Sequence, residues 1–266
     1  LEAGTTYAYR VGSPSNDYWS EWYTFTTAPE DGKFEVMIAS DLQSSTQSAY
    51  QRIAKIQKDA AEKVFTDGVS FVINPGDIVD NGRNLSQYKW LYDSDQSFYA
   101  SHASVAAAGN HDDKYFTLAK ASNVDAYGGV SEGAYVNDYN YMWTHYNYGI
   151  PSSQVDNTGF YYSFDYGKVH FTVLNTNDIE SIKSKTTTDE GKEKTVTTKQ
   201  LGTKQYEWLV NDLDSTDKEW KVVVMHKALY SEGSHSYDKD VVGMRAQLTP
   251  LFAEKGVNLV IAGHDH

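Results

Sequence analysis

Five short apolar segments of this chain are each followed directly by polar side chains. The apolar segments have the length and composition of buried strands, and residues with helical periodicity separate several of them. The segments that carry the polar residues are Ser40–Gln43, Gly76–Asp80, Gly109–Asp112, Met225–His226 and Gly263–His266. The alternation predicts an α/β fold in which helices cover the sheets. Because sites in such folds are built at the carboxyl ends of strands, these five segments are expected to meet.

The strands are predicted from short apolar runs and the helices from apolar stripes. The predicted strands cover residues 34–39, 69–73, 104–108, 221–225 and 257–262, with two more between 160 and 174 around a turn at Tyr166–Gly167. The helical stripes are Ile53, Ile56, Ala60 and Val64; Tyr206, Leu209, Val210 and Leu213; and Leu248, Leu251 and Phe252. Residues 181–200 are polar and rich in Lys and Thr, which predicts a flexible excursion or a solvated hairpin.

Residues 1–29 differ from the rest of the chain. Leu1–Val11 and Trp22–Thr26 each alternate apolar with polar residues, and a turn-forming stretch separates them. This pattern predicts a β-hairpin, followed by a linker at Ala28–Gly32. Because an isolated hairpin is marginally stable, it belongs either to a truncated β-sandwich or to a sheet edge of the main domain. The predicted division is residues 1–31 and a domain at 32–266.

The charge of the chain limits its partners. The net charge is −13, from 23 basic and 36 acidic residues, which argues against binding along a nucleic-acid backbone. A small phosphorylated substrate is compatible, since bound cations dominate a local field. There is no Cys, which excludes disulfides and thiolate ligands and fits an extracellular or cell-surface bacterial protein. No apolar run is long enough to span a membrane, and the start at Leu1 is interpreted as removal of an N-terminal part.

The polar segments supply the ligands of a two-metal centre. Such a centre needs one carboxylate that bridges the ions, with further ligands that saturate neither ion. Asp77 is the natural bridge, and Gly76 allows the backbone to turn tightly beside it. A neutral amide oxygen and three imidazoles complete the set, from Asn110, His226, His264 and His266. The last two are two residues apart, so in an extended chain they share a face and each reaches a neighbouring ion.

The charge balance of this centre favours a phosphate ester. Two divalent ions with the carboxylates of Asp41 and Asp77 leave about two positive charges, or about one with a bridging hydroxide. The ions would lower the pKa of bound water to about 7, which provides a hydroxide nucleophile at neutral pH. Because every donor atom is O or N, two divalent or mixed-valence ions of Fe, Zn or Mn are expected.

These segments resemble the calcineurin-like metallophosphoesterase superfamily across nearly all of residues 33–266. Further residues are similar to its purple acid phosphatase branch, and the N-terminal hairpin resembles the last strands of the fibronectin-III-like domain that precedes the catalytic domain there. These residues are Met225–Tyr230, His235, Met244–Arg245, Leu248–Phe252, Tyr162–Gly167 and Val169–Phe171. The resemblance implies a four-layer αββα sandwich of two mixed sheets, preceded by a hairpin remnant of that domain.

The resemblance also implies roles for single residues. The first metal would be bound by Asp41, Asp77 and His266, and the second by Asp77, Asn110, His226 and His264. His111 resembles the histidine that contacts the phosphate and helps the leaving group depart, with Asp112 orienting it. His235 resembles a second substrate-side histidine and is a candidate general acid.

Two positions depart from the family pattern. Gln43 stands where the superfamily often has His, and it is either a weak metal ligand or a donor to the groups around the metals. Asp80 stands where purple phosphatases have the Tyr that colours their iron, so no purple chromophore is expected, and Asp80 is interpreted instead as a residue that supports the metal ligands. The chain also stops at His266, a proposed ligand, before strands that the family would place after it.

The predicted function is hydrolysis of phosphate monoesters by attack of a metal-bound hydroxide. Two alternatives stay open. One is a phosphodiesterase or nucleotidase of the same fold, and the other is a non-catalytic cell-surface binding module that retains the fold. About two transition metals per chain would support an enzyme, and none after metal supplementation would support the binding module.

Overall fold

Two sheets form the centre of the molecule. The computed structural model describes residues 1–82, 84–112, 161–187 and 191–266. One sheet has the order β5-β6-β7, with β5 (Val36–Ile38), β6 (Phe71–Asn74) and β7 (Ala103–Ala106). The other has the order β13-β12-β9-β8, with β8 (Tyr162–Tyr166), β9 (Val169–Val173), β12 (Trp220–Lys227) and β13 (Leu259–Gly263). The strands predicted for these sheets are therefore present, with small shifts at their ends.

The two sheets differ in strand direction. In the four-stranded sheet β8 and β9 are antiparallel, whereas β9, β12 and β13 run parallel. Both described pairings of the three-stranded sheet, β5 with β6 and β6 with β7, are parallel. Helices connect those strands, and such crossovers make parallel neighbours, while the tight turn at Gly167 joins β8 to β9. Within the described residues, the prediction of mixed sheets thus holds for the four-stranded sheet only.

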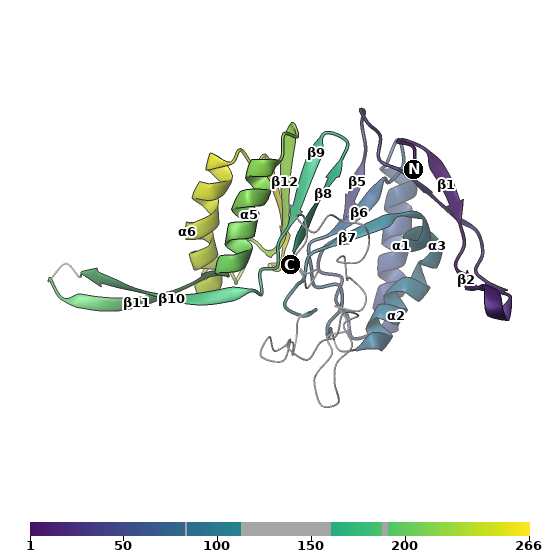
Figure 1. Cartoon of the computed structure of the whole chain (residues 1–266). Helices are drawn as coiled ribbons and strands as arrows, with labels where there is room; N and C mark the ends of the chain where they lie inside the picture. Colours follow the sequence, from purple (N-terminus) through teal and green to yellow (C-terminus); the bar gives the residue numbers. More distant parts are fainter. Residues whose placement is uncertain (83, 113–160, 188–190) are drawn as a thin grey trace.

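Helices lie along the outer sides of the two sheets (Figure 1). Beside the three-stranded sheet lie α1 (Gln47–Lys63), α2 (Leu85–Ser94) and α3 (Gln96–Ser101), and beside the four-stranded sheet lie α5 (Thr203–Ser215) and α6 (Lys239–Glu254). The chain thus has the predicted mixed α/β fold. In the part of the chain that the structure describes, no helix combines the length and apolar character needed to cross a membrane.

The largest apolar contact between the sheets is aromatic. Phe71 of β6 packs edge-on against Phe171 of β9, with ring centroids 5.5 Å apart, and Phe164 of β8 stacks on Phe171 at 5.0 Å. Val222, Val224 and Ile261 extend this core along β12 and β13. Because the facing side chains of both sheets share one core, the ends of their strands are fixed relative to one another.

The buried face of α1 differs from the prediction. Ile56 and Val64 are exposed, whereas Tyr50, Ala54 and Gln57 are the buried residues. Positions 50, 54 and 57 follow the spacing of one helical face, and on this face Gln57 accepts a hydrogen bond from Tyr99 of α3 at 3.1 Å. The predicted stripe was built on the larger apolar side chains and was therefore wrong at its two exposed positions. The helices predicted from Leu209 and Leu213 and from Leu248 and Leu251 are confirmed, with these residues buried.

The N-terminal segment forms the predicted hairpin. β1 (Thr6–Tyr9) pairs antiparallel with β4 (Tyr23–Thr26), and two short strands, β2 (Gly12–Ser13) and β3 (Tyr18–Trp19), pair within the connection. The Tyr9 hydroxyl donates to the Ala100 carbonyl of α3 at 2.5 Å. This contact anchors the hairpin beside α3 (Figure 1).

A second hairpin extends away from the four-stranded sheet (Figure 1). β10 (Ile179–Thr187) pairs antiparallel with β11 (Glu193–Leu201), and most of its residues are exposed. Its base is fixed to α6, because the Leu201 amide donates to Gln247 Oε1 at 3.0 Å. Of the two structures predicted for residues 181–200, the solvated hairpin is the one observed.

Candidate metal centre

The proposed ligands gather where the parallel strands end. Asp41 follows β5, Asp77 follows β6, and Asn110 follows β7. On the other sheet, His226 lies near the end of β12, and His264 and His266 follow β13. The loops after parallel strands emerge at one edge of a sheet, and the two sheets pack together, so side chains far apart in the sequence meet there.

Several of these residues have backbone conformations that non-glycine residues seldom adopt. The φ angles of Asp41, Asp77 and His264 are 54°, 51° and 77°, all in the left-handed region. His266 has a φ of 29°. The 264–266 segment is therefore not the extended chain expected from the sequence, although its two imidazoles still reach different neighbours. Strained conformations of this kind collect at functional sites, where surrounding contacts enforce them.

Three ligand atoms surround one nitrogen of His226. Its Nε2 lies 3.0 Å from Asn110 Oδ1, 3.2 Å from His264 Nδ1 and 3.3 Å from Asp77 Oδ2. The other ring nitrogen, Nδ1, lies 3.0 Å from the Pro75 carbonyl oxygen. A carbonyl only accepts, so Nδ1 carries a proton, and Nε2 is the atom that would offer a lone pair to a metal that displaced its own proton.

A second group of donors lies on the other side of Asp77. Atoms of Asp41, Asp77 and His266 lie within 4.8 Å of one another, as do atoms of Asp77, His226 and His264. Asp77 is common to both groups, which is the position expected of a bridging carboxylate. Its carboxylate is also held by the protein, because Oδ1 accepts the His111 amide at 2.8 Å.

Gln43 contacts one of the imidazoles. Its side-chain amide lies 2.8 Å from His266 Nε2. With the amide nitrogen turned inward, it donates to the Asp41 and Asp77 carbonyls at 3.0 and 3.2 Å, and its oxygen faces His266. Of the two roles left open for Gln43, its observed contacts are those of a residue that holds a ligand in place.

Glycines permit these close approaches. Gly76 has a φ of 113°, and a Cβ there would lie 2.5 Å from His226 Nδ1. A Cβ on Gly109 would lie 2.1 Å from Asp77 Oδ1. Any larger residue at either position would displace a proposed ligand, so the two glycines are required by packing as well as by backbone conformation.

The cluster shifts the ionisation of its members. Burial opposes the charge on Asp77, but hydrogen bonds from His226 and the His111 amide hold the pKa of Asp77 below its usual value. Burial likewise opposes the charge on His226, yet Asp77 and Asp41 raise the pKa of His226 above its ordinary value. Burial, together with His226 and His235, lowers the pKa of His264 to about 4. His264 is therefore neutral at pH 7, the form in which an imidazole binds a metal.

Asp112 does not orient His111, contrary to the prediction. Asp112 Oδ1 accepts the amides of Ile78 and Val79 at 2.9 and 3.2 Å, and Oδ2 accepts the Gly109 amide at 3.0 Å. The side chain thus fixes the two loops that carry Asp77 and Asn110. Burial and the nearby Asp77 raise the pKa of Asp112 to about 7.

The contact that orients His111 comes from Asp80. His111 Nδ1 lies 2.8 Å from the Asp80 carbonyl oxygen and 3.4 Å from its carboxylate. The sequence indicated Asp80 as a support of the site from outside the ligand set, but not its partner His111, because a main-chain carbonyl contact leaves no trace in residue types.

His235 lies against the ligand cluster. Its ring centroid is 4.3 Å from that of His264, and its Nδ1 pairs with Asp238 Oδ2 at 2.8 Å. Asp238 was not identified from the sequence, although a carboxylate three residues after a histidine was a usable signal. The Asp265 carboxylate was also missed, and it accepts the His235 amide at 3.0 Å.

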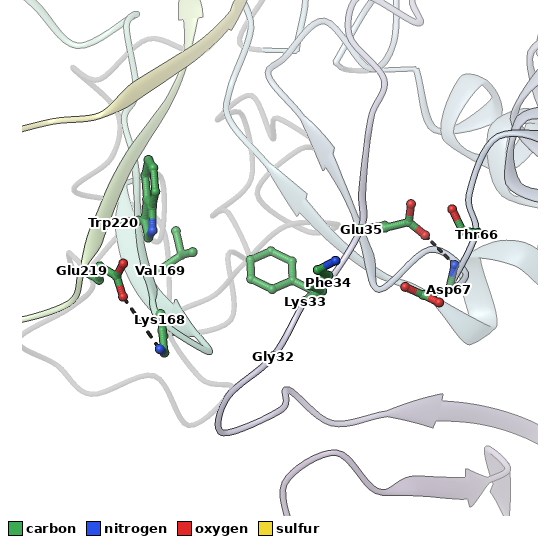
Figure 2. A pocket seen from close by; sticks show the side chains of 10 residues that line it. All are labelled: Gly32, Lys33, Phe34, Glu35, Thr66, Asp67, Lys168, Val169, Glu219 and Trp220. Carbon is green, nitrogen blue, oxygen red and sulfur yellow. Dashed lines mark hydrogen bonds and ion pairs between the residues drawn. The ribbon is translucent and has the colours of Figure 1, made fainter.

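A cavity of about 510 Å³ lies at the opposite ends of the strands (Figure 2). Its lining includes Glu35 just before β5, Lys168 just before β9, and Glu219 and Trp220 at the start of β12. Two of these side chains already have charged partners, because Lys168 lies 3.2 Å from Asp31 and 3.9 Å from Glu219. None of the proposed ligands lines this cavity.

The donor set fits two cations. Two groups of ligand atoms share one carboxylate, all donors are oxygen or nitrogen, and the tautomer of His226 is fixed by a backbone carbonyl. Such a set suits Zn, Fe or Mn. An α/β fold that gathers such donors where its strands end is compatible with the metallophosphoesterase class. A family model described as "Calcineurin-like phosphoesterase" matches residues 34–266, and the chain belongs to this family.

Purple acid phosphatases are among the relatives of this chain. It is 25% identical over 276 residues to "Probable purple acid phosphatase 20" of Arabidopsis thaliana, covering 100% of this chain and 52% of the relative. It is 31% identical over 123 residues to "Purple acid phosphatase 23" of the same plant, covering 45% of this chain and 22% of the relative. This chain thus spans about half of the relative it matches end to end.

Two solved structures share the fold. A purple acid phosphatase from yellow lupin (Lupinus luteus) seeds aligns with a TM-score of 0.65 at 19% identity, covering 99% of this chain and 44% of that one. The structure of PhoD aligns with a TM-score of 0.56 at 19% identity, covering 98% of this chain and 56% of that one. At these identities the likeness shows the fold alone.

Proposed function

We propose that this chain is a dinuclear-metal phosphoesterase that hydrolyses phosphate monoesters. The observation that carries the proposal is the position of Asp77, which belongs to two groups of ligand atoms at once. A single-metal or structural site has no need of a shared carboxylate at this position. The names of the relatives, acid phosphatases among them, favour a monoester over a diester.

The two groups, with Asn110 beside His226, support the division of ligands that the family resemblance implied. Asp41, Asp77 and His266 would hold one cation, and Asp77, Asn110, His226 and His264 the other. A bound pair of such cations supplies an activated water and the positive charge that attracts a phosphoryl group. The shared position of Asp77 keeps the two sites within reach of one substrate.

The remaining steps belong to side chains of the chain itself. As the water oxygen bonds to phosphorus, the ester P–O bond breaks and the leaving oxygen needs a proton. Asp238 engages His235 Nδ1, so Nε2 is the atom from which His235 would donate that proton. Asp80 engages His111 Nδ1, which directs the other edge of the His111 ring away from the Asp80 loop, where it would contact a phosphate oxygen.

The finer fold assignment is supported by the same resemblance. The order of helices, sheet, sheet and helices in Figure 1 supports a four-layer αββα sandwich for residues 32–266. The two-stranded β1–β4 sheet supports a fibronectin-III-like remnant in residues 1–31. The lack of Cys agrees with an extracellular or cell-surface location.

Metal loading and a substrate panel test the function. The chain, stripped by a chelator, is supplied with Mn, Zn or Fe and analysed for metal, and then assayed on aryl phosphate monoesters, phosphodiesters and nucleotides. We expect about two ions per chain, with hydrolysis of monoesters that disappears again on chelation. With iron we expect no purple colour, since no Tyr stands at position 80. Loading without hydrolysis of any ester would contradict the proposal.

A further inference from the structure

The loop that carries His235 is fixed to α6 on one side. We call residues 229–238 the His235 loop. Arg245 of α6 donates through Nε to the Leu229 carbonyl and through Nη2 to the Ser236 carbonyl, the latter at 2.7 Å. Its guanidinium also lies over the Tyr230 ring, 5.1 Å from the centroid. These contacts hold the loop to the helix, and none of them involves a proposed metal ligand.

The same loop is fixed on its other side by Asp265. Asp265 lies between the proposed ligands His264 and His266, and its Oδ1 accepts the His235 amide at 3.0 Å. The Ser231 side chain also hydrogen-bonds this carboxylate. At Gly233 the two segments approach so closely that an added Cβ would lie 2.3 Å from Asp265 Cγ. One carboxylate therefore joins the segment that offers two imidazoles to the His235 loop.

This connection sets where the His235 ring lies. The ring is 4.3 Å from the His264 ring, and Asp238, on the same loop, engages its Nδ1. Asp238 moves with the loop, so it orients the ring but does not place the loop relative to the ligands. Among the described contacts, the Asp265 carboxylate is the one that joins the loop backbone directly to the 264–266 segment.

We propose that Asp265 is a positioning residue that couples the 264–266 segment to the His235 loop and so places His235 for proton transfer to the leaving oxygen. The kinetic part rests on the proposed function. The hydrogen bond itself is a property of the metal-free chain and is tested separately. A side-chain carboxylate suits this task because it accepts from the His235 amide and from Ser231 at the same time.

The first test measures amide hydrogen exchange of the metal-free protein. Asp265→Ala removes the acceptor of the His235 amide, while Asp265→Asn keeps one side-chain oxygen. We expect the His235 amide to exchange about tenfold faster in Asp265→Ala, with Asp265→Asn in between. The control is Asp214→Ala, which removes a surface ion pair with Lys255 and leaves the loop untouched. Equal exchange in the wild type and Asp265→Ala would overturn the proposal.

The second test measures kcat/KM on aryl phosphates of rising leaving-group pKa. In Asp265→Ala, kcat/KM should fall about tenfold to a hundredfold for phenyl phosphate and little for a strongly activated ester, with the metal content unchanged. Asp265→Asn should recover part of this loss. Gly233→Ala displaces the loop without altering a charge and should show the same dependence on the leaving group.

The outcomes of the two tests are distinguishable. If the loaded wild type hydrolyses no ester, the proposed function fails, while the exchange experiment still decides whether Asp265 holds the loop. If Asp265→Ala loses metal, Gly233→Ala provides the kinetic comparison. An equal loss on good and poor leaving groups in both variants would show that Asp265 is merely structural and would sink the positioning role.

Discussion

The inner strands of the two sheets hold a buried pair of ligands, whereas the outer strands hold a more exposed pair. β6 and β12 are flanked on both sides in the described sheets, and they supply Asp77 and His226, which are 1% and 0% exposed. β5 and β13 lie at sheet edges and supply Asp41 and His266, whose side chains are 11% and 64% exposed. Burial of a ligand therefore depends on the place of its strand in the sheet.

The two pairs also differ in how the chain holds them. Asp77 and His226 lie 3.3 Å apart, and each has a further contact to the main chain, through the His111 amide and the Pro75 carbonyl. Asp41 and His266 lie 3.8 Å apart. Asp41 accepts the His264 amide at 3.0 Å, whereas the ring of His266 contacts the flexible side chain of Gln43. Main-chain partners are fixed by the fold, so both residues of the inner pair are preorganised, whereas in the outer pair the His266 ring, held by side-chain contacts, is free to adjust.

The largest effect should come from breaking the inner pair. Asp77→Asn removes the shared negative charge, so we expect metal content to fall from about two ions towards none and kcat/KM to fall about a thousandfold or more, near 4 kcal/mol. His266→Ala should weaken the binding of one ion only. The loss of kcat/KM should be smaller, because Asp41 and Asp77 remain at that site and the ligands of the other ion are unchanged. Elemental analysis and monoester assays measure both. Equal losses in the two variants would erase the distinction between the pairs.

An intermediate effect should appear in folding stability when the support of the inner pair is removed. Asp112 accepts three main-chain amides, and Asn offers one oxygen and turns an NH₂ towards a donor. We expect Asp112→Asn to lower the free energy of unfolding of the metal-free chain by about 1–3 kcal/mol, measured in urea.

The matched control for Asp112→Asn is Asp214→Asn on the surface. Asp214 forms an ion pair with Lys255, and its side chain is 55% exposed. Asp214→Asn should lower the free energy of unfolding by no more than about 0.5 kcal/mol, as for other exposed pairs. If the two variants cost the same, Asp112 does not support the loops.

The sequence was sufficient to predict which residues converge, but not how they are held. Convergence was predictable because each donor directly follows an apolar run, and strand ends of a parallel sheet meet. The support of His226 and His111 comes from carbonyls of Pro75 and Asp80, and every residue has a carbonyl. Residue types therefore carried no signal for these contacts, and the family resemblance pointed instead to Asp112 as the partner of His111.

The secondary structure was likewise predictable where the sequence pattern is local and not predictable where tertiary contacts decide. Strands with continuous apolar runs were found because their pattern is local. On α1 the large apolar side chain of Ile56 was predicted to be buried and is exposed. Tyr50 and Gln57 are buried instead, because they pack against other parts of the fold. α2 and α3 gave no clear apolar period and were not predicted. Tertiary packing, which a single sequence does not display, decided these cases.

The remaining prediction concerns a charge network on β9 of the four-stranded sheet, away from the strand ends that carry the proposed ligands. His170 of β9 is buried between Asp165 and Asp212, with ring nitrogens 2.7 and 3.0 Å from their oxygens, and Lys218 lies 3.7 Å from Asp165. Burial opposes the charge, but the two carboxylates raise the pKa of His170 above 6.5. Protonated His170 therefore stabilises the fold fully below pH 6.5, the pKa of the unfolded chain. This stabilisation is lost as the pH rises through the raised pKa of the folded chain.

His170→Gln tests this charge network through the pH dependence of folding stability. We expect the substitution to lower the free energy of unfolding by about 2 kcal/mol at pH 5.5 and by progressively less at higher pH, measured by urea unfolding. Thr172→Val removes a hydrogen bond that a hydroxyl without charge donates to the same Asp212 carboxylate, at 2.8 Å. Because the hydroxyl does not titrate, the cost of this variant should stay level over that pH range. The network lies on β9, which is the neighbour of β12. If His170→Gln left the metal content unchanged, the inner pair would depend on the main-chain contacts at its own strand ends and not on this charge network. If the cost of His170→Gln in the free energy of unfolding did not vary with pH, the imidazole would be neutral in the folded chain and the predicted charge network would be wrong.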